Sequence, residues 1–190
     1  MKKLLIGLVL GAVTAGTGVY LYQRNQNAPS TGPADTAGST LSMASKGKKD
    51  AGASLRNVAM SGTVLTVKAG ESIQAAVTLA KPGDTIQVMP GTYKETVFID
   101  KDNIAIVGVI VDGEWPLMDG EHKLNDAILY SGNGIRIENM KIIHFKGNAI
   151  MGQSGNNFVI RHNWIVDTGV YGIFPEFATN GLIEYNVISG

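Results

Sequence analysis

The sequence contains no cysteine, which excludes disulfide bonds and every metal site that depends on thiolate ligands. It also lacks a charge excess of either sign, because 16 basic residues balance 16 acidic ones. Proteins that bind nucleic acid or an anionic surface carry basic surfaces, so neither partner is expected from the composition. Glycine is abundant, with 24 residues in a chain of 190, which suits a fold with many tight turns.

Residues 1–22 are predicted to form a targeting segment. Lys2 and Lys3 precede an apolar run, and Val13-Thr14-Ala15 offers small residues for a signal peptidase. The apolar character continues to Tyr22, which gives about 19 uncharged residues, nearly a membrane span. We expect either a cleaved signal peptide or an uncleaved anchor, so the protein is expected to be exported: periplasmic, extracellular or membrane-anchored. Membrane contact is expected only through this segment.

Residues 23–62 are predicted to be a disordered linker. They are rich in alanine, glycine, serine and threonine, include Pro29 and Pro33, and show no sustained hydrophobic period. Such a segment cannot bury enough apolar surface to offset the entropy lost on ordering. The folded domain is therefore expected to span residues 63–190.

The second half of the chain repeats with a period of 22–23 residues. Three apolar columns and one charged column share this period: Ile128/Ile150/Ile173, Ile137/Ile160/Ile183, Ile142/Ile165/Ile188 and Glu138/Arg161/Glu184. A repeat of this length is too short for a helix pair and is rich in β-branched residues, with glycine and asparagine at its corners. It predicts a parallel β-helix, in which each coil lies about 4.8 Å above the last.

An amphipathic helix is predicted at Ser72–Ala80, with Ser72 as its N-cap. Its apolar residues fall at i, i+3, i+4 and i+7, namely Ile73, Ala76, Val77 and Ala80. Lys81-Pro82-Gly83-Asp84 ends it. Because the first coil of a solenoid exposes its apolar interior, we expect this helix to act as a lid.

Several segments of the N-terminal half resemble the first coils of the right-handed parallel β-helix (pectin lyase-like) superfamily in order and spacing. They are Gly70-Glu71-Ser72-Ile73-Gln74-Ala75-Ala76, Lys81-Pro82-Gly83-Asp84-Thr85-Ile86, Pro90-Gly91-Thr92-Tyr93 and Asn103-Ile104-Ala105-Ile106-Val107-Gly108. The resemblance implies an all-β fold, a right-handed parallel β-helix solenoid with a short N-terminal capping α-helix. The superfamily includes lyases, hydrolases, esterases, epimerases and proteins without known chemistry, so it implies no single activity.

The stretch Val170-Tyr171-Gly172-Ile173-Phe174-Pro175-Glu176-Phe177 resembles the Tyr-Gly-Phe/Ile-Asp-Pro-His motif of mannuronan C5-epimerases and related alginate lyases. Phe174 stands at the acid position and Glu176 at the histidine position. Exchange of the C5 proton needs a base and an acid on opposite sides of that carbon, which Phe174 cannot supply. Epimerase activity is therefore not expected here. With the segment Asn180–Asn186, the stretch resembles exported bacterial parallel-β-helix-repeat proteins of the carbohydrate-binding and sugar-hydrolase group.

The catalytic residues are undetermined, with Tyr171, Glu176 and Arg161 as candidates. Arg161 shares a column with Glu138 and Glu184, so a salt ladder between stacked coils explains it equally well. If the protein is an enzyme, a polysaccharide lyase, hydrolase or epimerase type is expected.

The inward direction of Ile150 and Ile173 turns their neighbours outward. The resulting outward stripe is our predicted substrate-binding surface and comprises Met151, Gln153, Tyr171, Phe174 and Glu176. An aromatic ring offers stacking area to a sugar and a carboxylate accepts hydrogen bonds from its hydroxyls. Glu176 would repel a uronate, which favours neutral sugars at this point. The alternative is that a loop covers the stripe.

No metal site and no cofactor are predicted. The loop 113–126 and its flank contain Asp112, Glu114, Asp119 and Glu121, which offer oxygen ligands for Ca²⁺ but match no calcium-binding pattern; solvated loop acids are the alternative. The histidines, His122, His144 and His162, lack zinc-site spacing, so we expect turn or ladder hydrogen bonds for each.

Two functions stay open. The first is an exported β-helix repeat protein that binds or processes polysaccharide. The second is a non-catalytic surface or periplasmic protein with a structural or interaction role. The chain stops at Gly190 directly after a predicted strand, without a visible cap, so we expect further coils to follow in a longer protein. The oligomeric state is left open.

Overall fold

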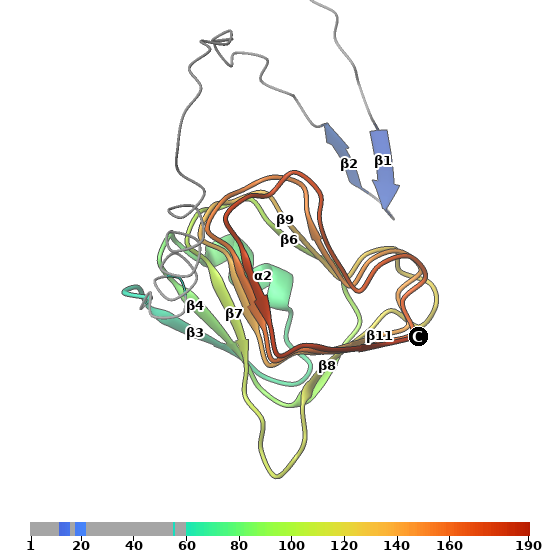
Figure 1. The fold of residues 1–190 in the computed structure, drawn as a ribbon. Helices are drawn as coiled ribbons and strands as arrows, with labels where there is room; N and C mark the ends of the chain where they lie inside the picture. The colour runs from blue at the N-terminus through green and yellow to red at the C-terminus, as the bar shows by residue number, and fades with distance from the viewer. Residues whose placement is uncertain (1–11, 16–17, 22–54, 56–59) are drawn as a thin grey trace, which may run out of the picture. The chain divides into compact units, whose positions relative to one another are not determined.

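The computed structural model describes residues 12–15, 18–21, 55 and 60–190 (Figure 1). Strands β1 (Ala12–Ala15) and β2 (Gly18–Leu21) form an antiparallel pair in a unit separate from the rest. Most of the predicted targeting segment and of the predicted linker lies outside the described residues. Among the described residues, no helix is long and apolar enough to cross a membrane.

Residues 60–190 form a parallel β-helix whose three faces are three parallel sheets. The six-stranded sheet contains β3 (Val64–Val67), β4 (Thr85–Val88), β7 (Ala105–Gly108), β10 (Arg136–Glu138), β13 (Val159–Arg161) and β16 (Leu182–Glu184). The five-stranded sheet contains β5 (Gly91–Tyr93), β8 (Pro116–Asp119), β11 (Lys141–Ile143), β14 (Trp164–Val166) and β17 (Val187–Ser189). The four-stranded sheet contains β6 (Val97–Ile99), β9 (Ile128–Tyr130), β12 (Ile150–Gly152) and β15 (Ile173–Pro175). The predicted all-β solenoid is confirmed, and Figure 1 shows its coils superimposed.

The strand register confirms the predicted apolar columns. Ile137 pairs with Ile160, which pairs with Ile183, and the same pattern joins Ile142 to Ile165. Ile137, Ile142, Ile160 and Ile165 are fully buried. Each such side chain contributes about 1.5–3 kcal/mol of burial free energy, so the columns are the main stabilising feature of the coil.

The predicted lid is confirmed as helix α2 (Ile73–Leu79), which lies across the first coils (Figure 1). Ser72 is its N-cap and accepts a hydrogen bond from the Ala75 N–H at 3.1 Å. The Glu95 carboxylate accepts hydrogen bonds from two further backbone N–H groups of the first turn. Lys101 Nζ donates hydrogen bonds to three carbonyls at the C-terminal end of the helix. A carboxylate at the N-terminus and an ammonium at the C-terminus complement the helix dipole. Residues of the β6 coil therefore hold both ends of the lid.

Two columns of left-handed corners bracket the five-stranded sheet. The corner before the strands holds Asn139, His162 and Tyr185, with φ of 57°, 55° and 53°. The corner after the strands holds His144 and Asp167, with φ of 57° and 52°. Residues other than glycine rarely adopt this backbone conformation, and asparagine, aspartate and histidine tolerate it best. The repeated backbone thus turns outward the side chains on both edges of one sheet.

Candidate functional site

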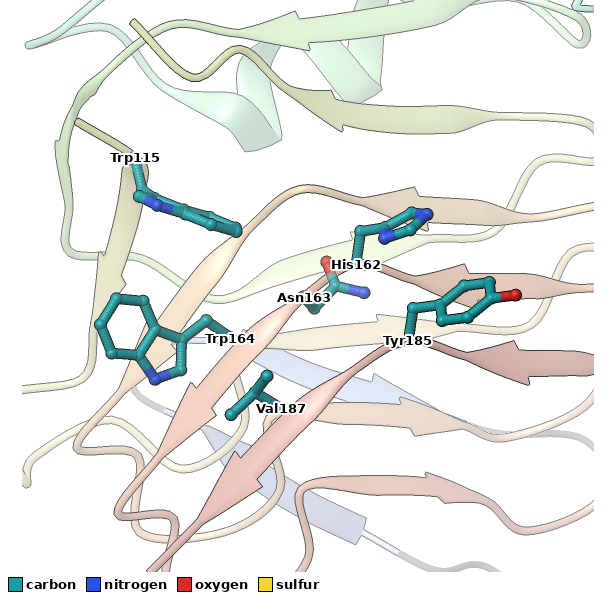
Figure 2. Close-up of a pocket in the computed structure, with 6 residues that line it drawn as sticks. All are labelled: Trp115, His162, Asn163, Trp164, Tyr185 and Val187. Carbon is teal, nitrogen blue, oxygen red and sulfur yellow. The ribbon is translucent and has the colours of Figure 1, made fainter. Parts of the chain in front are cut away.

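An open aromatic groove lies on the five-stranded sheet and its leading corner (Figure 2). Its volume is about 380 Å³. The lining comes from three levels of the stack and comprises Trp115, His162, Asn163, Trp164, Tyr185 and Val187. We call this set the aromatic groove.

The alternation of β14 places Trp164 in the aromatic groove. Ile165 points inward and is fully buried, so Trp164 on the opposite side points outward and is 38% exposed. Trp164 pairs with Lys141 on one side and Val187 on the other. Trp115 is not placed by strand alternation. It lies between the hairpin closed by Val111 and Glu114 and the start of β8.

The rings of the aromatic groove are arranged in two pairs. Trp115 and Trp164 contact edge to face, with centroids 6.1 Å apart and planes at 76°. His162 and Tyr185 stack nearly parallel, with centroids 5.1 Å apart and planes at 11°. Lys141 Nζ lies 3.9 Å from the centroid of the Trp164 ring, a cation–π distance. The groove therefore combines flat apolar faces with one adjacent cation.

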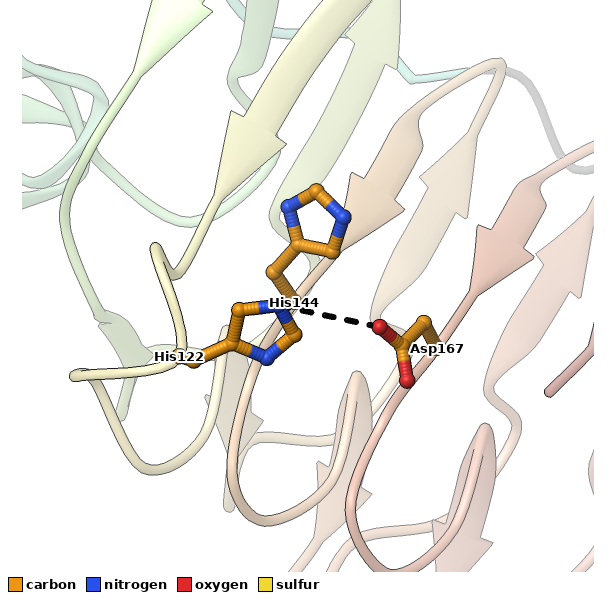
Figure 3. A group of neighbouring side chains, drawn as sticks. All are labelled: His122, His144 and Asp167. Atoms are coloured by element: carbon orange, nitrogen blue, oxygen red, sulfur yellow. Dashed lines mark ion pairs between the residues drawn. The ribbon is translucent and has the colours of Figure 1, made fainter.

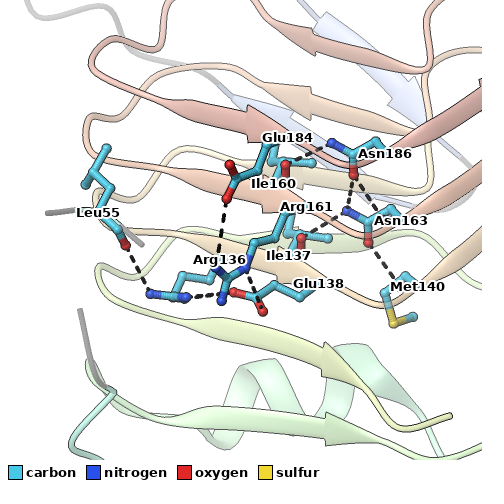
Figure 4. Close-up of polar contacts among 10 residues, drawn as sticks. All are labelled: Leu55, Arg136, Ile137, Glu138, Met140, Ile160, Arg161, Asn163, Glu184 and Asn186. Carbon is cyan, nitrogen blue, oxygen red and sulfur yellow. Dashed lines mark hydrogen bonds and ion pairs between the residues drawn. The ribbon is translucent and has the colours of Figure 1, made fainter. Parts of the chain in front are cut away.

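An asparagine ladder fixes the floor of the aromatic groove (Figure 4). The side chain of Asn163, only 1% exposed, accepts the Met140 N–H at 3.1 Å and donates to the Ile137 carbonyl at 3.0 Å. Asn186 repeats this one coil later, accepting the Asn163 N–H at 3.0 Å and donating to the Ile160 carbonyl at 2.9 Å. Because two successive coils turn on the same bonds, the spacing of their corner side chains is set by the backbone.

The predicted substrate-binding stripe lies on a different face, the four-stranded sheet. Met151 pairs with Phe174, and Tyr171 packs against Phe174 with ring centroids 4.8 Å apart. Gln153 is half-buried and donates its backbone N–H to Tyr130, while Glu176 is exposed. The structure thus brings Met151, Tyr171 and Phe174 together, and their sugar-binding role stays a prediction.

The predicted salt ladder at Arg161 is confirmed (Figure 4). Arg161 Nε lies 3.1 Å from Glu138 Oε2, and Arg161 Nη1 lies 4.0 Å from Glu184 Oε1. Arg136 also pairs with Glu138, with Nη2 and Oε1 2.8 Å apart, and its Nη1 donates to the Leu55 carbonyl at 3.4 Å. The ion pairs with Glu138 and Glu184 give Arg161 a structural role in joining coils.

The three catalytic candidates fall on two faces. Arg161 ends β13 of the six-stranded sheet, whereas Tyr171 and Glu176 flank β15 of the four-stranded sheet. Their assignment to a reaction stays a prediction.

The acidic residues of the loop are divided among different partners. Glu121 pairs with Lys94 at 2.6 Å, and this hydrogen bond is the main cause of the lowered pKa of Glu121. Asp119 Oδ1 accepts the Glu121 N–H at 2.9 Å and lies 3.0 Å from His144 Nδ1. Burial acts to raise the pKa of Asp119, but these two bonds together with the nearby charges of His144 and Lys94 outweigh it, and the pKa is lowered. Asp112 and Glu114, the other two acids considered as oxygen ligands for Ca²⁺, are exposed in the hairpin.

Sequence reasoning missed the aromatic groove and a second cluster, formed by His122, His144 and Asp167 (Figure 3). The signal was the period itself. His144 and Asp167 stand 23 residues apart, as do Lys141 and Trp164, so each pair occupies one column. Zinc-site spacings along the chain describe ligands within one turn or loop, whereas a solenoid collects ligands from successive coils.

No protein-family model, no curated protein and no solved structure matches the chain. The fold is therefore established by the strand register, and the resemblance to the pectin lyase-like superfamily stays a prediction.

Proposed function

We propose that this protein binds a polysaccharide along the aromatic groove and does so outside the cytoplasm. The observation that carries the proposal is that both tryptophans of the chain, Trp115 and Trp164, line one open groove. Exposed aromatic faces in a depression mark binding surfaces, because indole rings offer large rigid contact area at low entropic cost. The uncharged N-terminal run of residues 4–22 supports export.

The dimensions of the solenoid suit a polymer lying along the stack. The groove is lined from three of four successive levels, by Trp115 before β8, by His162 to Trp164 at β14, and by Tyr185 with Val187 at β17. The level between the first two, β11, places Lys141 beside Trp164. Successive coils rise by about 4.8 Å, roughly the length of one sugar unit. A sugar chain can thus meet one set of side chains per residue.

The charge around the aromatic groove favours an acidic polysaccharide. None of its six lining residues is a carboxylate, and Lys141 holds its ammonium over the Trp164 ring. An ammonium beside a stacking ring offers both a charge partner for a uronate and a surface for its ring. On the predicted stripe, by contrast, Glu176 repels a uronate.

The test is isothermal titration of the full chain with a neutral oligoglucan and with an oligouronate. Trp164→Ala is expected to weaken binding of the oligouronate by about 10-fold or more, because buried aromatic anchors dominate binding energy. Phe174→Ala, on the four-stranded sheet, is the matched control and is expected to leave the affinity unchanged. Loss of binding in Phe174→Ala with unchanged binding in Trp164→Ala and Trp115→Ala would move the site to the predicted stripe.

The second candidate is a non-catalytic structural or interaction protein. It is favoured by the strong exposure of Tyr185 and Val187, at 70% and 60%, which suits a protein partner as well as a sugar. A chain that binds neither glycan in the titration supports this reading.

A further inference from the structure

We propose that His122, His144 and Asp167 form a binding site for a divalent transition-metal ion such as Zn²⁺. Each residue offers one ligand atom, and these atoms all lie within 4.8 Å of one another. The site lies at the edge of the five-stranded sheet opposite the aromatic groove, and it does not depend on glycan binding.

The side chains come from three successive coils, and Figure 3 shows His122 directed at Asp167 with the His144 ring beside them. His122 Nε2 lies 3.7 Å from Asp167 Oδ2, and the centroids of the His122 and His144 rings are 4.6 Å apart. Tetrahedral Zn²⁺ with bonds of about 2.0–2.1 Å needs its ligand atoms about 3.3 Å apart. The ligand atoms must therefore approach from within 4.8 Å to this spacing, and the exposed side chains of His122 and Asp167 are free to rotate toward an ion.

The backbone keeps the three coils in register. The His122 N–H donates to the His144 carbonyl at 2.8 Å, and the His144 N–H donates to the Asp167 carbonyl at 3.0 Å. The Asp167 N–H continues the ladder to Ser189 at 2.9 Å. Because the ladder fixes the three backbones, closing on an ion requires movement of side chains only.

A carboxylate outside the cluster orients the central histidine. Asp119 Oδ1 lies 3.0 Å from His144 Nδ1, which holds the proton on Nδ1 and leaves the Nε2 lone pair available. A ligating histidine whose other nitrogen donates to a carboxylate is the usual arrangement in protein metal sites. The bond from the Glu121 N–H at 2.9 Å holds Asp119 in place in turn.

The donor set selects the class of ion. Two imidazole nitrogens and one carboxylate oxygen suit Zn²⁺ and its first-row neighbours, whereas Ca²⁺ and Mg²⁺ prefer oxygen ligands. Three protein ligands leave a fourth position of a tetrahedral ion for water or another ligand. The side chains of His122 and Asp167 are 65% and 60% exposed, so that position faces solvent.

The test is isothermal titration of the tag-free full chain with Zn²⁺, and with Ca²⁺ and Mg²⁺ for comparison. We expect one Zn²⁺ per chain and no binding of the other two ions at the same concentrations. His144→Ala and His122→Ala are each expected to lower the Zn²⁺ affinity at least 10-fold. Asp119→Asn is expected to lower it by about 10–100-fold, because Asp119 positions His144.

The matched control is His162→Ala, which removes the remaining histidine and is expected to leave the Zn²⁺ affinity unchanged. Thermal melting provides a second readout, with Zn²⁺ raising the Tm of the parent and of His162→Ala but not of His144→Ala. A parent chain that does not bind Zn²⁺, or equal losses in His162→Ala and His144→Ala, overturns the proposal.

Discussion

The two edges of the five-stranded sheet share one backbone and differ in chemistry. Both are columns of left-handed corners, with φ of 55° at His162 and 52° at Asp167. The leading edge carries stacked rings around Trp164, whereas the trailing edge carries imidazole and carboxylate groups around His144. Backbone conformation therefore decides that side chains project at these corners, and the sequence of each coil decides which chemical groups project there.

The two ends of strand β8 contribute to both edges. Trp115 directly precedes β8 and contributes to the aromatic groove, while His122 follows β8 and joins the histidine cluster. The later coils supply the rest of each site by repetition. The comparison teaches that a single coil with a longer loop can add side chains to two edges of a solenoid without changing its register.

The largest expected effect is on folding itself, which would disrupt both edges together. Ile160→Asp places a carboxylate where the side chain is fully buried between Ile137 and Ile183, and we expect a loss of more than about 4 kcal/mol of folding free energy. Urea denaturation followed by circular dichroism measures it. Ile183→Asp is the control, because Ile183 is 46% exposed in the same column and should cost far less. A folded Ile160→Asp chain of normal stability contradicts the register.

A smaller effect should disturb the leading edge alone. Asn163→Ala leaves the buried Met140 N–H and Ile137 carbonyl without their side-chain partner, which should cost about 1–3 kcal/mol. We expect a lower Tm and weaker glycan binding, with Zn²⁺ affinity preserved. Equal weakening of both ligands would show that the edges are not independent.

The sharpest separation of the two edges uses the two ends of strand β8. Trp115→Ala should weaken oligouronate binding by about 10-fold, equivalent to about 1.4 kcal/mol, and leave Zn²⁺ binding intact. His122→Ala should do the reverse. Parallel titrations of both variants with both ligands check this, and a variant that loses both ligands would point to a folding defect in the insertion.

The smallest expected effect concerns the corner backbone. His162→Asn keeps a residue that tolerates the left-handed conformation, so we expect a change in stability of no more than about 0.5 kcal/mol. His162→Val should cost about 1–2 kcal/mol, because a β-branched side chain clashes there. If the two variants melt at the same temperature, the corner geometry does not restrict this position.

The sequence was sufficient to predict the solenoid fold and insufficient to predict the aromatic groove and the histidine cluster. The column of Ile137, Ile160 and Ile183 could be predicted because apolar residues at a fixed period indicate inward positions stacked in successive coils. The start of the helix could be predicted because a serine such as Ser72 is a favoured N-cap, whose side chain accepts a backbone N–H of the first turn. The contact between Trp115 and Trp164 depends on the path of an insertion that has no repeat to align it. His122 likewise meets His144 only because its loop returns to the stack two residues after Gly120.

The predicted substrate-binding stripe also shows what strand alternation can and cannot predict. The alternation around Ile150 and Ile173 correctly places Met151 and Phe174 as neighbours on the outer face. The same alternation around Ile142 and Ile165 places Lys141 beside Trp164, a pair that the sequence also contained. Periodicity identifies outward columns equally well on every face, and the depth of the groove beside one of them requires the three-dimensional structure.

Intrinsic fluorescence tests the central claim most directly, because Trp115 and Trp164 are the chain's two tryptophans and both line the aromatic groove. The full chain is titrated with an oligouronate while its tryptophan emission is recorded, and the same solutions are measured by calorimetry. We expect a saturable change in emission whose midpoint equals the calorimetric dissociation constant, with the same response in Phe174→Ala. Calorimetric binding without any change in tryptophan emission would place the sugar elsewhere and contradict the account.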